Sequence, residues 1–174
     1  MKTIKQNLII IALILSSIVS AQEQLSISLS QDARLGILGD KEHGYNAGTI
    51  NVLVKLKMSG NQQKYGFLSV YPEFEYAAIQ GDYYRYSANV GYTFNKLLIE
   101  NLEAGSFIGY GIGERNGLTW DSFSLNGELA YKLSSKIKLL LNAQFVQRKD
   151  LELMYNDNNV IRFSGFFGIE FKII

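Results

Sequence analysis

Apolar and polar residues alternate along most of this chain, and the segment from Tyr84 to Asn95 shows the alternation most clearly. Its even-numbered positions are aromatic or aliphatic, whereas its odd-numbered positions are charged, polar or glycine. A helix would scatter these two sets around its circumference, but a β-strand places them on opposite faces. The pattern therefore predicts a strand with one apolar and one polar face.

Other segments of similar length sort in the same way, which predicts an all-β chain of eight strands. The remaining predicted strands run from Leu25 to Arg34, Thr49 to Met58, Leu68 to Tyr76, Glu103 to Gly113, Ser122 to Leu133, Lys136 to Arg148 and Arg162 to Ile173. Pro72 falls inside the third strand, where its missing N–H should interrupt the ladder. We expect a bulge or a strand end at this residue.

The connections between the predicted strands fall into two alternating sets. One end should carry Gly39–Asn46, Gln80–Asp82, Glu114–Gly117 and Lys149–Asn159, and the other Gly60–Lys64, Lys96–Asn101 and Ser134–Ser135. An even number of strands returns both termini to the second end, which in a membrane barrel of bacteria is the periplasmic one. The longest polar loop, after the seventh strand, then lies outside the cell.

The first residues have the three parts of a secretory signal peptide. Lys2 and Lys5 precede the apolar run Leu8–Leu15, and the small-residue stretch Ser16–Ala21 ends in a cleavage site between Ala21 and Gln22. A transmembrane anchor is the alternative, but the apolar stretch is shorter than the ~20 residues that a spanning helix needs. The final Ala-Gln pair resembles signal peptides of the Bacteroidetes. We therefore expect residues 1–21 to be removed and residues 22–174 to form one domain.

Composition removes several classes of function. The chain has 17 basic and 16 acidic residues, so its charge gives no reason to expect a nucleic-acid partner. The absence of cysteine excludes disulfides, thiolate metal sites and a lipid-modified cysteine. Tyrosine (11) and phenylalanine (10) are abundant, which suits β-strands.

Alternation does not by itself distinguish a membrane barrel from a soluble exported barrel that binds an apolar ligand. The apolar faces extend over nearly the ~9–11 residues that a tilted strand needs to cross a bilayer. Aromatic residues also gather near both ends of these faces, as expected at the two membrane interfaces. The predicted periplasmic girdle comprises Tyr65, Tyr92, Phe94, Tyr131 and Phe171, and the outer girdle comprises Tyr76, Tyr84, Tyr110, Phe123, Phe145 and Phe163.

Together these features resemble the small eight-stranded outer-membrane barrels such as OmpX and the transmembrane domain of OmpA, over residues 24–174. Gly168, Phe171 and Ile173 resemble the terminal signal read by the barrel assembly machinery, although the family normally ends on an aromatic residue and this chain ends on Ile174. The resemblance implies a closed antiparallel up-and-down transmembrane β-barrel in a Gram-negative outer membrane. It also implies contact with membrane lipid and lipopolysaccharide, insertion by that machinery, and a monomer.

The polar faces carry charges of both signs, which an eight-stranded barrel would enclose. The inward charge network that we predict comprises Arg34, Lys55, Lys57, Glu73, Glu75, Arg85, Glu103, Glu128, Arg162 and Glu170, with Asp32, Lys138, Arg148 and Lys172 on the same faces. Because a lumen of this size is filled by side chains, we interpret the set as a paired polar core. A narrow ion or proton path is the alternative. The glycines of Gly109–Gly113 should leave inward room for a large side chain such as Phe107 or an arginine.

The sequence contains few candidates for catalytic or metal-binding residues. Glu73 and Glu75 could act as acid and base, but salt bridges to Lys57 or Arg85 are the simpler use. His43, the only histidine, would need a serine such as Ser122 to form the nucleophilic site of a lipid-modifying enzyme. The last outer loop offers oxygen ligands for a cation in Asp150, Glu152 and Asp157, without EF-hand spacing. We expect no catalytic residue, cofactor or metal, and a structural or surface-interaction role through the outer loops.

Overall fold

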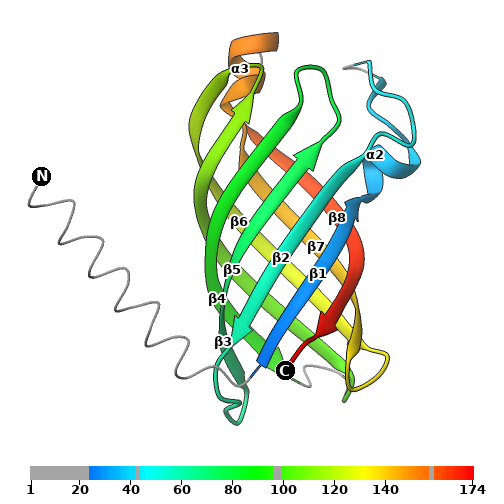
Figure 1. Ribbon diagram of the computed structural model, residues 1–174, viewed down its shortest axis with the longest axis vertical. Helices are drawn as coiled ribbons and strands as arrows, with labels where there is room; N and C mark the ends of the chain where they lie inside the picture. Colours follow the sequence, from blue (N-terminus) through cyan, green and yellow to red (C-terminus); the bar gives the residue numbers. More distant parts are fainter. Residues whose placement is uncertain (1–23, 42–43, 96–98, 157–158) are drawn as a thin grey trace, which may run out of the picture.

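The computed structural model describes residues 24–41, 44–95, 99–156 and 159–174, which form a closed antiparallel barrel (Figure 1). The strands are β1 (Gln24–Asp32), β2 (Asn51–Ser59), β3 (Gly66–Ala77), β4 (Tyr83–Asn95), β5 (Leu102–Arg115), β6 (Leu118–Lys132), β7 (Ile137–Gln147) and β8 (Ile161–Lys172). Each strand pairs with its neighbours in sequence, and β8 closes the sheet against β1. The predicted fold class is confirmed.

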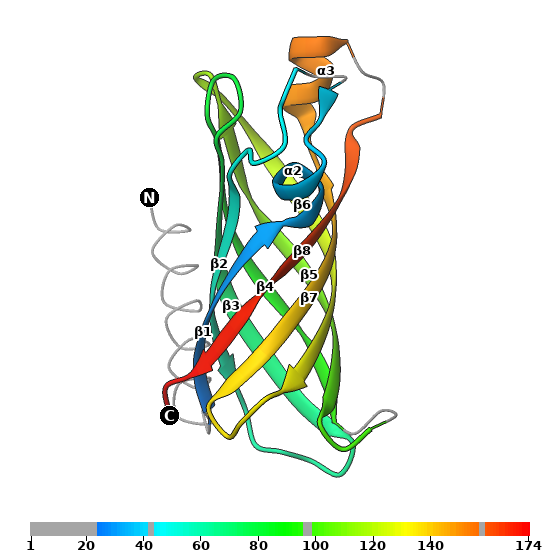
Figure 2. The same ribbon diagram turned by 90° about the vertical axis from the view of Figure 1, so that its right-hand side faces the viewer.

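Two short helices lie toward the end of the barrel opposite the C-terminus (Figures 1 and 2). The helix α2 (Ala33–Ile37) follows β1 directly, and α3 (Lys149–Tyr155) lies between β7 and β8. Among the described residues, neither helix has the length and apolarity to cross a bilayer. The predicted signal peptide and its cleavage site between Ala21 and Gln22 lie outside the described residues.

The first predicted strand was too long, because the chain turns into α2 after Asp32. The Asp32 carboxylate accepts a hydrogen bond from the Leu35 backbone N–H (2.8 Å) and so caps the first turn of the helix. Arg34 therefore lies in a helix and not on a strand face, and its side chain is about half exposed (48%). The placement of Arg34 inside the lumen was wrong.

The barrel has the inverted arrangement of a membrane protein, with its apolar face outward. Large outward side chains such as Ile108 (65% exposed), Leu125 and Leu141 meet the surroundings, while Lys55 and Arg85 are almost fully buried. A soluble barrel would hide the first group and expose the second. The alternative of a soluble barrel with an apolar interior is thus contradicted.

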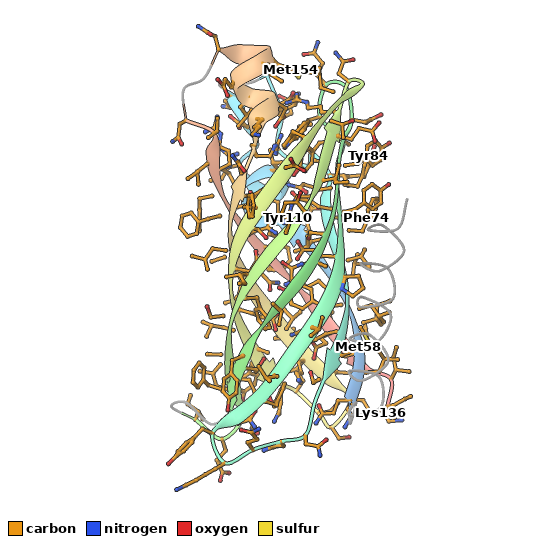
Figure 3. The ribbon with its side chains drawn as sticks, turned by 90° about the vertical axis from the view of Figure 1, so that its left-hand side faces the viewer. Met58, Phe74, Tyr84, Tyr110, Lys136 and Met154 are labelled. Atoms are coloured by element: carbon orange, nitrogen blue, oxygen red, sulfur yellow. The ribbon has the colours of Figure 1, made fainter. Side chains whose placement is uncertain are left out.

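Aromatic residues pair across neighbouring strands on the outer surface. Tyr76 and Tyr84 face each other on β3 and β4 with ring centres 5.2 Å apart, and Phe145 and Phe163 do so on β7 and β8 at 5.1 Å. Figure 3 shows Tyr84 and Tyr110 toward the end that carries α3, with Lys136 at the opposite end. These rings lie where the outer girdle was predicted.

Pro72 lies in the middle of β3 and causes neither a bulge nor a strand end. The pairing of β3 with β4 runs through Pro72 and Ala88 without a break. On the other side, β2 pairs at Lys55↔Glu73 and resumes at Met58↔Val70 with the same offset. The ladder to β2 is therefore interrupted only near Pro72, while the pairing of β3 with β4 continues through this residue. The predicted bulge was wrong.

Candidate functional site: the lumen and outer mouth

The lower part of the lumen, toward the C-terminus, is filled by a lysine–carboxylate network. Glu128 on β6 accepts hydrogen bonds from Lys55 (3.2 Å) and from Lys57, both on β2 across the barrel. Lys55 also donates to the Asn142 side chain (2.7 Å). These groups are all nearly inaccessible, so each charge is compensated where solvent cannot reach it.

The same network continues to the rim through Lys138. Its ammonium group lies 3.1 Å from Glu170 and 2.9 Å from Glu103, and Glu170 also faces Lys57 at 3.2 Å. Lys132 approaches Glu103 from the barrel end at 2.7 Å and is 40% exposed. The predicted polar core thus includes an unbroken chain of ion pairs from mid-barrel to the C-terminal end. We name the pairs among Lys55, Lys57, Lys132, Lys138, Glu103, Glu128 and Glu170 the lysine network.

Arg85 organises the upper part of the lumen. Its guanidinium lies 2.7 Å from Glu73 and 3.9 Å from Glu75, and it also donates to Ser122 (3.2 Å) and Ser124 (2.7 Å). The side chains of Arg85 and Glu73 are fully buried. The two carboxylates on one strand face therefore serve as counter-charges to Arg85, as the salt-bridge interpretation expected, although Lys57 is not their partner.

Glu73 is the most heavily bonded carboxylate of this upper part. Besides Arg85, its Oε1 atom accepts hydrogen bonds from Ser87 (3.2 Å) and Gln144 (3.0 Å). Donors from β4 and β7 thus converge on one oxygen atom from β3. We call the group of Glu73, Glu75, Arg85, Ser87, Ser122, Ser124 and Gln144 the arginine network.

An aromatic pair lies between the two networks. The rings of Tyr71 and Phe107 meet edge to face with centres 5.1 Å apart. Lys55 lies 5.0 Å from the centre of the Tyr71 ring, and Lys57 lies 5.6 Å from that of Phe107. These contacts place the cations of the lysine network directly against the aromatic pair.

The room for Phe107 comes from glycines other than the predicted ones. A Cβ atom added at Gly91 or Gly105 would lie only 2.5 Å from the Phe107 ring. Within the predicted run, a Cβ at Gly113 would instead meet Trp120 at 2.5 Å. Phe107 was the right side chain, but the glycines that admit it are Gly91 and Gly105.

At the outer end, α3 is attached to the barrel mouth through Asp150. The Asp150 carboxylate lies 2.9 Å from Arg115 at the end of β5 and 2.7 Å from Arg148 just before the helix. Burial by itself raises the pKa of Asp150, but the hydrogen bonds and charges of Arg148 and then Arg115 outweigh it and hold the pKa below its ordinary value of 3.8. Arg148 also stacks on the Tyr83 ring at 3.8 Å. We call these contacts of Asp150 the mouth latch.

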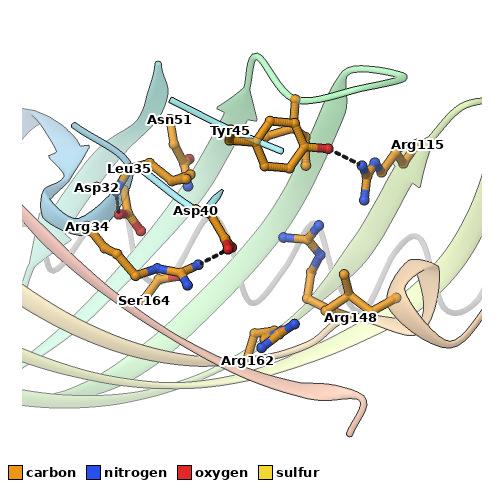
Figure 4. Close-up of a pocket in the computed structure, with 12 residues that line it drawn as sticks. Asp32, Arg34, Leu35, Asp40, Tyr45, Asn51, Arg115, Arg148, Arg162 and Ser164 are labelled. Atoms are coloured by element: carbon orange, nitrogen blue, oxygen red, sulfur yellow. Dashed lines mark hydrogen bonds and ion pairs between the residues drawn. The ribbon is translucent and has the colours of Figure 1, made fainter. Parts of the chain in front are cut away.

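A small cavity of about 50 Å³ remains below the mouth (Figure 4). Arg34 pairs with Asp40 at 3.1 Å on one side, and Arg115 donates to the Tyr45 hydroxyl at 2.9 Å on the other. Arg162 also lines this cavity. The cavity has room for a few water molecules but not for a sizeable substrate.

The structure thus brings together eight of the ten predicted charges, and leaves Arg34 and Arg162 at the mouth. The eight are Lys55, Lys57, Glu73, Glu75, Arg85, Glu103, Glu128 and Glu170. Sequence reasoning missed Tyr83 and Arg115, which continue the inward periodicity of their strands by one position beyond the predicted ends. Extending the alternation into the loops would have found both.

The candidate nucleophile and the candidate cation ligand are both engaged in contacts within the protein. Ser122 is fully buried, accepts a hydrogen bond from Arg85 and donates to the Gln147 carbonyl (3.0 Å), while His43 lies outside the described residues. Asp150 is occupied by two arginines, which contradicts its use as a calcium ligand. In the described part of the chain, no group of three or more His, Asp or Glu side chains could hold a metal ion.

No family model and no curated protein matches the sequence. Among solved structures, the outer-membrane protein Ail of Yersinia pestis in a phospholipid bilayer nanodisc superimposes with a TM-score of 0.55 at 14% identity, over 86% of this chain and 99% of Ail. A de novo designed transmembrane β-barrel matches with a TM-score of 0.50 at 11% identity, over 88% of this chain and 96% of the design. The chain therefore has the fold of a small outer-membrane β-barrel.

Proposed function

We propose that this protein is an integral outer-membrane barrel without enzymatic activity that acts through its outer surface, as a structural or surface-interaction protein. The observation that carries the proposal is the filled lumen. The lysine network, the Tyr71–Phe107 pair and the arginine network occupy successive levels, and the mouth latch holds α3 at the outer end. The residues left for contact with other molecules are those of the outer loops and the lipid-facing surface.

The proposed partners follow from the outer surface. The apolar band meets membrane lipid, and the outer aromatic girdle meets the head groups of the outer leaflet, including lipopolysaccharide. The barrel assembly machinery would insert the chain, guided by the C-terminal strand. We propose a monomer, because a closed barrel leaves no unpaired strand edge to recruit a second copy.

Fractionation and gel mobility test the membrane placement. We expect the protein to pellet with the outer membrane and to run as a compact band when unboiled, shifting to its full apparent mass after boiling. A lumen tied by buried ion pairs should resist detergent until heated. Recovery in the soluble periplasmic fraction, with no change on boiling, would contradict the proposal.

Surface labelling tests which end faces outward. Because the chain has no cysteine, single cysteines can be introduced cleanly at Leu153 in α3 and at Ser134 in the turn between β6 and β7. An impermeant maleimide should label Leu153→Cys in intact cells, and Ser134→Cys only after the outer membrane is permeabilised. The reverse result would invert the orientation and remove the surface role of α3.

A further inference from the structure

The helix α2 lies on the flank of the barrel, whereas α3 lies over its end (Figures 1 and 2). Leu35 points inward and is buried at the mouth cavity, but Ile37 (65% exposed) and Leu38 (70% exposed) have no such cover. Both helices expose an aliphatic side chain, since Leu153 of α3 is 64% exposed. Their different positions imply different surroundings for these side chains.

The surface next to α2 belongs to the apolar band of the barrel. The helix contacts β8. The part of β8 that extends past its pairing with β1 carries two outward side chains, Ile161 and Phe163, and both are 56% exposed. Ile50, at the start of β2, is 52% exposed. The strands on either side of α2 thus present exposed apolar side chains at this end of the barrel, and Phe163 among them belongs to the outer girdle.

The polar groups around α2 are satisfied by the protein itself. The Gly48 N–H donates to the carbonyls of Leu35 (3.2 Å) and Gly36 (3.0 Å), and the N–H groups of Leu38 and Gly39 donate to the Arg34 carbonyl (2.8 Å each). With Asp32 capping the first turn, the Leu35 N–H at the start of the helix and the Arg34, Leu35 and Gly36 carbonyls have partners within the protein. Such internal pairing is required wherever water is scarce.

Gln31 gives an independent indication of an apolar environment. It follows Ile27 and Leu29 on the lipid-facing side of β1, where a polar side chain would be costly. Its amide donates to the Thr49 carbonyl (3.2 Å) and accepts from the Asn51 N–H (3.3 Å). A Cβ atom at Gly36 would lie 3.5 Å from the Gln31 side chain, so α2 folds back over this amide and shields it.

We infer that α2 is an interfacial helix whose Ile37 and Leu38 side chains lie among the acyl chains of the outer leaflet. Arg34 of the same helix is half exposed and pairs with Asp40 at the mouth cavity, so the charged side chain of α2 and its aliphatic side chains Ile37 and Leu38 have different surroundings. The inference rests on the proposed membrane placement and adds a lipid contact made outside the strands. The occupant that we propose for this surface is lipid and not a protein partner, because the outward side chains of the adjoining strands, Ile50, Ile161 and Phe163, belong to the exposed apolar face of the barrel.

Collision measurements on spin labels test the inference. Cysteines introduced one at a time at Ile37, Leu38, Leu125 and Leu153 are labelled with a nitroxide, in protein reconstituted into phosphatidylcholine–phosphatidylglycerol vesicles. Oxygen gathers in the bilayer and a nickel chelate in water. We expect the oxygen-to-nickel collision ratio at Ile37 and Leu38 to resemble that of lipid-facing Leu125, and to exceed that of Leu153 several-fold.

The controls separate the two possible failures. If Leu125 reports lipid while Ile37 and Leu38 resemble Leu153, the interfacial helix is wrong and the membrane barrel stands. If Leu125 also reports water, the membrane placement itself fails. Each variant is first checked for the compact unboiled band, so that an unfolded chain is not mistaken for an exposed helix, and Ile37 and Leu38 provide two independent readings of the same helix.

Discussion

The two halves of the lumen both neutralise buried carboxylates, but they use different cationic side chains. The lysine network joins single ammonium groups to carboxylates that are shared between two cations, whereas Arg85 uses several donors to reach carboxylates and hydroxyls together. The lower half is complete within the strands. The upper half is finished by α3, a loop element, through Asp150. The outer mouth therefore depends on contacts that can be broken without dismantling the barrel.

Removing Arg85 should cause the largest loss of stability. Arg85→Ala removes the cation that pairs with the buried carboxylates of Glu73 and Glu75, and breaking a buried pair in this way costs about 3–5 kcal/mol. Urea unfolding of the reconstituted protein measures the change. Lys132→Ala is the matched control at the exposed rim of the lysine network, where the loss should stay below about 1 kcal/mol.

A triple variant that replaces Arg85 and both carboxylates sharpens this test. Arg85→Met combined with Glu73→Gln and Glu75→Gln removes every charge of the trio and should recover much of the lost stability. If Arg85→Ala costs no more than Lys132→Ala, the upper lumen is hydrated enough to screen its charges, and the two halves do not differ as described.

Releasing α3 should have the next largest effect, confined to the mouth. Asp150→Asn removes the charge that joins Arg115 and Arg148, and charge-assisted hydrogen bonds of this kind are worth about 1.5–3 kcal/mol. A spin label at Leu153→Cys should become more mobile, while the urea midpoint of the barrel changes little. Glu152→Gln, on the same helix but exposed, is the control that should leave the label unchanged.

The aromatic pair between the networks predicts a smaller and more local effect. Gly91→Ala would bring its Cβ to 2.5 Å from the Phe107 ring and 2.0 Å from the Ser106 carbonyl, and overpacking of this kind costs about 1–3 kcal/mol. Gly165→Ala points into open space on the outer face and should be nearly neutral. Equal losses at both glycines in urea unfolding would show that Phe107 has room to move.

The lower half of the molecule could be predicted from the sequence almost entirely, and the upper end could not. Strict alternation determines which side chains point inward, so Lys55, Glu128 and Glu170 were assigned correctly. Which cation meets which carboxylate depends on the stagger of the closed sheet, and alternation does not contain that information. The sequence therefore suggested Lys57 as one possible salt-bridge partner of Glu75. In the structure, Lys57 pairs with Glu170 instead.

The two helices were missed because each is too short to show a helical period. The helix α2 has five residues and α3 has seven, fewer than two turns in each case. Alternation assigned Arg34 to the polar face of the first strand. In the structure the strand ends at Asp32, which caps α2, so Arg34 lies in the helix. Asp150 looked like a loop oxygen ligand because Arg115 lies 35 residues away at the end of β5 and reaches it only through the fold. Arg148 is only two residues away, but its position was assigned to the inner face of the seventh strand.

Release of α3 by acid should be the smallest effect at the mouth. A carboxylate whose pKa is lowered on folding contributes stability that is complete above its unfolded pKa and lost as the pH falls through the folded one. For Asp150 this window begins below its ordinary value of 3.8.

The mobility of a label at Leu153→Cys should therefore be constant between pH 7 and roughly pH 4, and then rise. In the Asp150→Asn background the label should be mobile throughout, with no acid-dependent step. A rise that begins near neutral pH, or one that persists in Asp150→Asn, would assign the latch to another group.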